Sequence, residues 1–325
     1  MRAVTLAQTG RKRPSKRPLQ KTYESRPMET LRLENVSKSF DKVEAVKSLN
    51  FSVSPGTMYG FLGPNGAGKT TTLRMIMEII LPDAGAIHLL GQPNALYLRD
   101  RVGYLPEERG LYRKMKVHEA LHFFAELKGM RKKDYLAKVN IWLDRFDLGP
   151  ARDKKVEELS KGNQQKLQFL TTVLHEPDLV ILDEPFMGLD PLNVQLVKDV
   201  MLEQKKRGAA IVFSTHQMHE AERLCDAICL INRGEKMLDG NLASIKKSYG
   251  PKNIILSYTG KSDYLQDQAL VEHYNDYGQY VEVTLQKGVA PKAFLYRALE
   301  HAEITRFEVA EPSLHEIFLS VVKSN

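Results

Sequence analysis

Apolar residues follow three patterns along the chain, and each pattern predicts a different kind of element. Between Leu31 and Val53 they alternate with polar residues, which predicts two antiparallel strands that meet at a turn near Phe40. Two later runs, Leu179–Leu182 and Ala210–Phe213, are apolar without a break, as is typical of parallel strands buried on both faces. From residue 117 to 148 apolar residues recur every three or four positions, which predicts helices.

In chain order, the predicted elements form an alternating α/β part and a smaller part that follows it. The remaining elements of the first part are predicted strands before Gly63 and at 86–90, 101–105 and 227–231, and helices after Gly68, before Pro177, at 192–207 and through Ala221. Beyond Gly240 come strands at 254–258, 280–285 and 305–309 and helices at 291–300 and at the C-terminus, the last with a capping-box pattern at Ser313 and Glu316. We expect residues 28–243 to form the first domain, with a helical insert at about 110–175, and residues 244–325 to form a small α+β domain.

The apolar run that begins at Met58 stops at a glycine-rich sequence, GPNGAGKT, and a helical pattern follows. In this order of strand, turn and helix, such a sequence cradles phosphate oxygens with backbone N–H groups. Lys69 supplies a positive charge for the β- and γ-phosphates, and the Thr70 hydroxyl is a ligand for Mg²⁺. The residues that we predict to bind the nucleotide are Gly63, Pro64, Asn65, Gly66, Ala67, Gly68, Lys69, Thr70 and Thr71.

Polar side chains follow two of the buried strands: Asp183 and Glu184 after the first, and His216 after the second. An Asp-Glu pair at a strand end is often a solvated turn, and a lone histidine is more often structural. Here, however, both groups follow strands of the sheet that also leads into the phosphate loop, and ligands bind at the carboxyl ends of such strands. We therefore predict that Asp183 binds Mg²⁺, Glu184 polarises an attacking water and His216 reaches the γ-phosphate, which favours hydrolysis.

The net charge of +7 is confined to the N-terminal end of the chain. Residues 1–27 hold eight of the 47 basic residues and one of the 40 acidic residues, so the remainder is neutral, with 39 of each. We therefore expect no nucleic-acid-binding face. The tail 1–27 has no apolar period, and we interpret it either as disordered or as an extension upstream of a start at Met28.

Two cysteines, Cys225 and Cys229, lack the partners of a zinc site or a disulfide framework, and we expect buried thiols. No apolar run approaches the 18 residues of a membrane helix, and no signal-peptide pattern opens the chain, so we predict no membrane-spanning segment.

The order of these motifs resembles that of an ATP-binding subunit of an ABC transporter. The motifs that carry the resemblance are Phe40, GPNGAGKT, the Pro106-Glu107 loop, LSKGN (159–163), LVILDE (179–184), the loop Gly188-Leu189-Asp190 and His216. The resemblance implies a phosphate-loop NTPase (RecA-like) core with an antiparallel β subdomain. It also implies ATP and Mg²⁺ as cofactors and Phe40 stacking on the base. Because LSKGN separates this family from other phosphate-loop ATPases, the resemblance is specific.

The resemblance further implies a head-to-tail dimer, either a homodimer or a pair of ATPase subunits, with ATP at the interface. In it Ser160, Gly162, Asn163 and Asp190 contribute to the ATP sites. Two positions of the signature depart from the commonest form, Lys161 in place of glycine and Asn163 in place of glutamine. The resemblance also implies Glu107 as a nucleotide-binding residue and a ligand of Mg²⁺. Glu107 stands where glutamine usually sits, and its carboxylate brings extra negative charge towards Mg²⁺ and the γ-phosphate.

The sequences PEERGLY and EPSLHEIF, together with the small C-terminal domain, resemble the ABC-2-type exporter branch, which includes sodium and drug efflux systems. The chain is then an ATPase at the cytoplasmic face of the membrane that powers export through a separate integral-membrane permease. We expect Tyr112 and Met115, at the entrance of the helical insert, to anchor that partner. The alternatives are a soluble ABC ATPase that acts on ribosomes or DNA and a phosphoryl-transfer kinase. LSKGN and the following helix argue against the kinase, and the transported substrate cannot be read from the chain.

Overall fold

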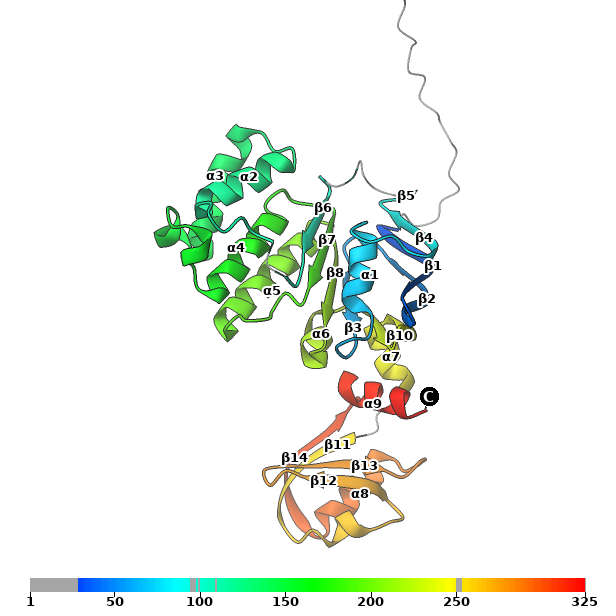
Figure 1. Cartoon of the computed structure of the whole chain (residues 1–325). Coiled ribbons are helices and arrows are strands. Elements are labelled where there is room, and N and C mark those ends of the chain that lie inside the picture. Colours follow the sequence, from blue (N-terminus) through cyan, green and yellow to red (C-terminus); the bar gives the residue numbers. More distant parts are fainter. Residues whose placement is uncertain (1–28, 94–97, 99, 109, 250–252, 325) are drawn as a thin grey trace, which may run out of the picture.

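The computed structural model describes residues 29–93, 98, 100–108, 110–249 and 253–324. The basic tail at 1–27 therefore lies outside the described residues. Figure 1 shows an antiparallel sheet and a helical region on opposite sides of a central sheet, and a smaller sheet near the C-terminus. Among the described residues, no helix combines the length and the apolar character that a membrane crossing requires.

The first sheet confirms the predicted antiparallel hairpin. Its strands, in the order β2-β1-β4-β5, are β1 (Leu31–Phe40), β2 (Val43–Val53), β4 (Ala84–Leu89) and β5 (Gln92–Pro93). Leu31, Leu33 and Val36 of β1 are buried while the residues between them are more exposed, which is the alternation that predicted the strand. β4 begins two residues earlier than expected, at Ala84, because Ala84 already pairs with Ser37 of β1.

The central sheet has the order β10-β9-β3-β8-β7-β6. Its strands are β3 (Met58–Leu62), β6 (Val102–Leu105), β7 (Leu179–Asp183), β8 (Ala210–Thr215), β9 (Ala227–Asn232) and β10 (Glu235–Asn241). All neighbouring pairs are parallel except β9 and β10. The predicted buried strands β7 and β8 are buried along their whole length. In register, Leu62 pairs with Thr215 and Asp183 with Ser214, so the carboxyl ends of β3, β7 and β8 meet.

Two apolar cores lie on opposite faces of this sheet, because successive side chains of a strand point to opposite faces. Met58 and Leu62 of β3 pack with the helices of the insert, whereas Tyr59 and Phe61 pack with the antiparallel sheet. The helix α1 lies on the side of the antiparallel sheet, and the others cover the opposite face (Figure 1). The helices of the two faces together are α1 (Lys69–Ile76), α2 (Val117–Leu127), α3 (Lys132–Arg145), α4 (Lys161–Val173), α5 (Pro191–Lys206) and α6 (Met218–Leu224). Single 3-10 turns lie at Gly149–Ala151 and Val156–Glu158.

The C-terminal part forms its own sheet, in the order β12-β13-β11-β14, around a third core. Its elements are α7 (Leu242–Tyr249), β11 (Asn253–Gly260), a 3-10 turn (Asp263–Gln266), β12 (Val271–Asp276), β13 (Val281–Leu285), α8 (Pro291–Leu299), β14 (Ala302–Ala310) and α9 (Leu314–Ser324). The sequence did not predict β12, because VEHYND is polar and all but its first residue are exposed. The capping box is confirmed: the Ser313 N–H donates to Glu316 Oε2 (2.7 Å), and the Glu316 N–H donates to Ser313 Oγ (3.2 Å).

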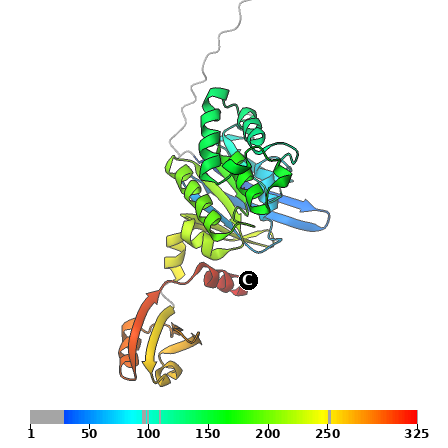
Figure 2. The same cartoon turned by 90° about the vertical axis from the view of Figure 1, so that its left-hand side faces the viewer.

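The last helix returns to the first part of the molecule. Figure 2 shows α9, in dark red, below the first part of the molecule and above the C-terminal sheet. Leu314 and Ile317 are buried in the same apolar core as the insert helices, and the Leu314 N–H donates to the Glu222 carboxylate of α6 (3.2 Å). The chain therefore leaves the first part through α7 and comes back to it through α9.

Candidate nucleotide site

The glycine-rich loop between β3 and α1 has a backbone that its sequence requires. Gly68 is the N-cap of α1 with φ 103°, and a Cβ at this position would lie 2.4 Å from the carbonyl oxygen of Ala45. Only glycine allows both the left-handed conformation and this close approach. The helix thus starts within the loop, and its unpaired first N–H groups face the space where an anion can bind.

Lys69 is folded back over this loop and is only 6% exposed. Its Nζ donates to the carbonyl oxygens of Gly63 (2.8 Å) and Pro64 (3.1 Å). Burial lowers the pKa of Lys69, while the nearby carboxylates of Glu184, Asp183 and Glu107 act in the opposite direction. The ammonium group is therefore held among acceptors at the centre of the loop.

A cavity of about 350 Å³ opens beside Lys69. It brings together residues that lie up to 139 positions apart in the sequence, and most of them were predicted to bind the nucleotide. The lining residues are Ala45, Asn65, Gly66, Gly68, Lys69, Thr70, Thr71, Glu107 and Glu184. Ala45 was not predicted, because an alanine in a strand carries no chemical signal.

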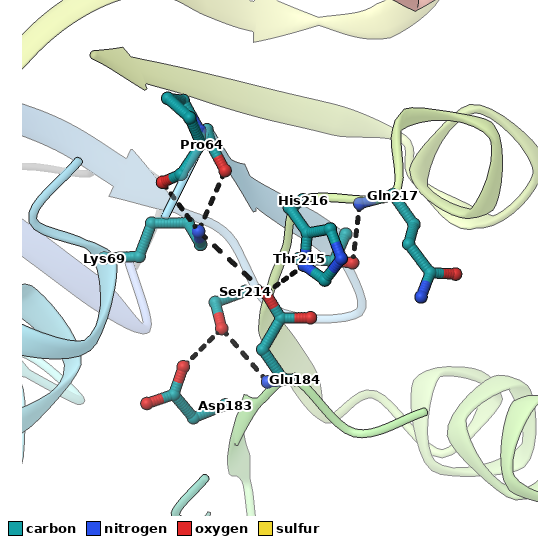
Figure 3. A network of polar contacts seen from close by, with 9 residues as sticks. Pro64, Lys69, Asp183, Glu184, Ser214, Thr215, His216 and Gln217 are labelled. Atoms are coloured by element: carbon teal, nitrogen blue, oxygen red, sulfur yellow. Dashed lines mark hydrogen bonds and ion pairs between the residues drawn. The ribbon is translucent and has the colours of Figure 1, made fainter. Parts of the chain in front are cut away.

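Glu184 connects the two strand ends that the sequence predicted to meet. Its Oε1 lies 2.9 Å from His216 Nδ1 and 3.9 Å from Lys69 Nζ (Figure 3). Because the carboxylate can only accept, the contact with His216 requires the proton on Nδ1. Glu184 has a φ of 48°, which is uncommon outside glycine, and its N–H donates to both the backbone oxygen (3.3 Å) and the Oγ (3.1 Å) of Ser214.

Asp183 is fully buried beside Glu184. Its Oδ1 accepts from Ser214 Oγ (2.5 Å), whereas no described residue forms a hydrogen bond with its Oδ2. Burial raises the pKa of Asp183, although the hydrogen bond from Ser214 and the nearby Thr70 hydroxyl favour the charged form. A buried carboxylate oxygen without a partner, next to the Thr70 hydroxyl, fits a divalent cation that prefers oxygen ligands. Within the described ranges, no group of three or more His, Cys, Asp and Glu residues could hold a metal by itself.

Ser214 is the residue of this network that sequence reasoning missed. Its hydroxyl donates to Asp183 and accepts from the Glu184 N–H, so one side chain of β8 fixes both acidic residues of β7 (Figure 3). The signal was present in the sequence, because Ser214 is a polar residue that directly follows a fully apolar run at the carboxyl end of a strand.

The remaining predicted residues lie away from this cavity in the single chain. Ser160 begins α4 and accepts from the Asn163 N–H (3.2 Å), and Asp190 begins α5 and accepts from the Asn193 N–H (3.0 Å). These two helix starts are neighbours, because a Cβ on Gly162 would lie 3.5 Å from the Gly188 carbonyl oxygen. The other predicted residues outside the cavity lining are Phe40, half-exposed at the end of β1, Gly63 and Pro64, whose carbonyls bind Lys69, and Ala67, which is buried.

The chain matches the family described as "ABC transporter" over residues 46–187 and "ATP-binding protein DrrA1-3-like, C-terminal domain" over residues 240–322. It is 41% identical over 292 residues to the ABC transporter ATP-binding protein YhaQ of Bacillus subtilis, covering 90% of this chain and 98% of that protein. This chain belongs to the ABC transporter ATP-binding proteins. It is therefore an ATPase of the ABC class, and its predicted fold class is confirmed.

Three further similarities concern this ABC ATPase. The Nod factor export ATP-binding protein I of Paraburkholderia xenovorans is 40% identical over 217 residues, which cover 66% of this chain and 71% of that protein. A solved "ATP binding subunit of ABC transporter" has a TM-score of 0.65 and 32% identity, covering 68% of this chain and 93% of the other. The cbiO1 protein of Clostridium perfringens, described as part of the ABC transporter complex cbiONQ, has a TM-score of 0.58 and 26% identity, covering 67% of this chain and 90% of that one.

Proposed function

We propose that this ABC ATPase hydrolyses ATP with Mg²⁺ and thereby powers the export of a substrate through a separate membrane-spanning permease. The observation that carries the proposal is the meeting of Lys69, Asp183, Glu184 and His216 at the carboxyl ends of three adjacent strands. The similarity to the Nod factor export ATP-binding protein I supports the export direction. The cbiO1 structure is described as part of a transporter complex, which supports a partner.

Each residue of the strand ends has a role in this proposal that follows from its surroundings. Lys69 binds the phosphates, exchanging its carbonyl contacts with Gly63 and Pro64 for phosphate oxygens. Glu184 acts as the base that orients a water, and His216, which donates to its Oε1, positions the carboxylate. Asp183 and Thr70 hold Mg²⁺, which neutralises phosphate charge when bound. Phe40 is the proposed stacking partner of the base.

The signature residues require a second subunit in this proposal. Ser160, Gly162 and Asn163 lie at the start of α4, and Asp190 lies at the start of the neighbouring helix α5. The N–H groups at a helix start bind anions, so this edge can complete the ATP site of a paired subunit, whether an identical copy or another ATPase.

The partner surface that we propose is the entrance of the helical insert. The Tyr112 side chain is 54% exposed, and its ring packs edge-on against Phe123 with centroids 5.3 Å apart. Met115 is partly buried against the core, so it packs beneath this surface and contributes less to its exposed area. A rigid, exposed aromatic ring is a suitable anchor for a cytoplasmic loop of a permease, which would hold the ATPase at the cytoplasmic face of the membrane.

Affinity purification from detergent-solubilised membranes tests the proposal. We expect wild type to bring down a polytopic membrane protein, and Tyr112→Ala to bring down at least severalfold less. Tyr296→Ala is the matched control, because Tyr296 is a tyrosine of similar exposure on α8 in the C-terminal part. Equal recovery by the two variants would exclude Tyr112 as an anchor. Reproducible recovery of ribosomes or DNA-repair proteins without a membrane protein would favour the soluble ABC ATPase.

A further inference from the structure

The signature helix α4 lies unusually close to β6, the strand at the end of the central sheet. A Cβ added at Gly103 of β6 would lie 2.3 Å from the carbonyl oxygen of Thr172 on α4. Only glycine permits this approach, since the neighbouring atom belongs to the backbone. β6 pairs with β7 on one side and has no strand on its other side in the described part of the chain. An uncovered strand edge presents backbone groups that need partners.

Two side chains of α4 supply those partners. Gln168 Nε2 donates to the carbonyls of Pro106 (3.4 Å) and Glu108 (3.1 Å). The Thr172 hydroxyl shares its one proton between the Gln168 carbonyl of its own helix (2.9 Å) and the Tyr104 carbonyl (3.3 Å). Gln168 and Thr172 are four residues apart and so lie on one face of the helix. The three accepting carbonyls belong to every second residue of the segment, at positions 104, 106 and 108. The side chains of α4 therefore also contact the backbone beyond Leu105, where β6 ends. The contact of Gln168 with the Glu108 carbonyl is shorter than its contact with the Pro106 carbonyl.

The residue between the two carbonyls that Gln168 binds is Glu107, which lines the cavity beside Lys69. Among the described residues, none forms a hydrogen bond or an ion pair with the Glu107 carboxylate. Its place in the cavity wall therefore depends on the backbone at Pro106 and Glu108. Gln168 is only 4% exposed, so its contacts with this backbone are shielded from water.

We propose that Gln168 is a positioning residue for ATP hydrolysis, which holds Glu107 at the wall of the nucleotide cavity by binding the carbonyls on either side of it. The inference rests on the proposed ATP site, and it assigns a role to a residue of α4 that does not touch the nucleotide cavity. Its physical basis is that the Glu107 side chain, which makes no hydrogen bond or ion pair with any described residue, can keep one place only if its backbone is fixed.

The first test compares steady-state ATP hydrolysis by wild type and Gln168→Met, which keeps an unbranched side chain of similar length but removes the amide. We expect kcat to fall about tenfold, as for the loss of a buried hydrogen bond, with little change in KM. Thr171→Val is the matched control, because it removes a buried hydroxyl from the same helix that binds only the Gln168 carbonyl (2.7 Å). Its kcat should stay within about twofold of wild type. Equal losses in both variants would indicate a general effect on α4 and would overturn the proposal.

A double-mutant cycle with Glu107→Ala separates positioning from a merely structural role. If Gln168 acts through Glu107, Gln168→Met should lower kcat in wild type but change it less than about twofold in the Glu107→Ala background. Losses that multiply would show that the two residues act independently and would overturn the proposal. If Gln168→Met does not fold, Gln168→Glu replaces it. This isosteric change sets a carboxylate against two carbonyls, and it should give the same coupling.

ATP hydrolysis by Glu184→Gln is measured in parallel, because this variant tests the proposed function independently of Gln168. Full hydrolysis by Glu184→Gln would reject Glu184 as the base. The comparison of Gln168→Met with wild type would still decide the role of Gln168. Loss of hydrolysis in Glu184→Gln together with normal hydrolysis in Gln168→Met would reject only the role of Gln168.

Discussion

The phosphate edge and the signature edge of this protein are built in opposite ways. The phosphate edge comprises Lys69, Asp183, Glu184 and His216, and all but His216 are buried. Hydrogen bonds join the ends of β7 and β8, and an ion pair between Lys69 and Glu184 joins them to the loop after β3. The signature edge consists of the starts of α4 and α5, where Ser160 and Asp190 are exposed and bind only their own helices. The residues of the phosphate edge are therefore positioned within a single chain. The signature edge presents two neighbouring helix starts at the surface, and we infer that a second subunit gives it its function.

This difference predicts that substitutions at the phosphate edge change the nucleotide site of a single chain. Substitutions at the signature edge should have an effect only when two subunits meet. The largest effect should come from Glu184→Gln, which preserves the shape of the side chain but removes the base. We expect at least about a hundredfold loss of ATP hydrolysis with ATP binding retained. Near-normal turnover would assign the base to another residue.

The same variant tests the second edge, because ATP that is bound but not hydrolysed should keep paired subunits together. Size-exclusion chromatography with light scattering should show a dimer with ATP and Mg²⁺ and a monomer without them. An ATP-bound form that stays strictly monomeric would contradict the inference that the signature edge serves a second subunit.

Lys69→Ala should have the next largest effect, on binding rather than on turnover alone. It removes a buried charge that now binds two carbonyls and is available to phosphate oxygens. Hydrogen bonds from charged groups are worth about 1.5–3 kcal/mol, so we expect ATP affinity to fall between roughly ten- and a hundredfold. Isothermal titration calorimetry in the Glu184→Gln background measures this without hydrolysis. Unchanged affinity would show that the loop backbone alone binds the phosphates.

Ser214→Ala should have a smaller effect at the same edge. It leaves Asp183 Oδ1 and the Glu184 N–H without their hydroxyl partner, although the Glu184 N–H keeps the Ser214 carbonyl at 3.3 Å. We expect about a tenfold loss of hydrolysis and a modest loss of thermal stability. Losing the hydrogen bond from Ser214 would also raise the pKa of Asp183 further. Thr215→Val on the neighbouring residue is the control, since among the described residues its hydroxyl binds only the Gln217 N–H.

The sequence was informative where one local pattern determined both structure and site. The apolar runs of β7 and β8 place Asp183 and His216 at strand ends, and the glycine spacing fixes the loop before Lys69. It was less informative where long-range pairing decided the outcome. β12 is polar and is a strand only because it pairs with β13. Likewise the amphipathic pattern of α9 predicts a helix but not the core against which the helix packs, which proved to be that of the insert helices.

The smallest effect, and the sharpest test of the comparison between the two edges, should come from Ser160→Ala. The change removes an N-cap, which costs about 1 kcal/mol of stability, but it removes no contact from the cavity beside Lys69. ATP binding by the single subunit should therefore stay unchanged, while hydrolysis and ATP-dependent dimer formation should fall severalfold. Ser313→Ala is a matched control, because Ser313 also caps a helix through an N–H at 3.2 Å but lies at the start of α9. Both variants should lose similar stability, and only Ser160→Ala should impair dimer formation in the Glu184→Gln background. If both impair it equally, lost stability explains the effect, and the signature edge has no separate role.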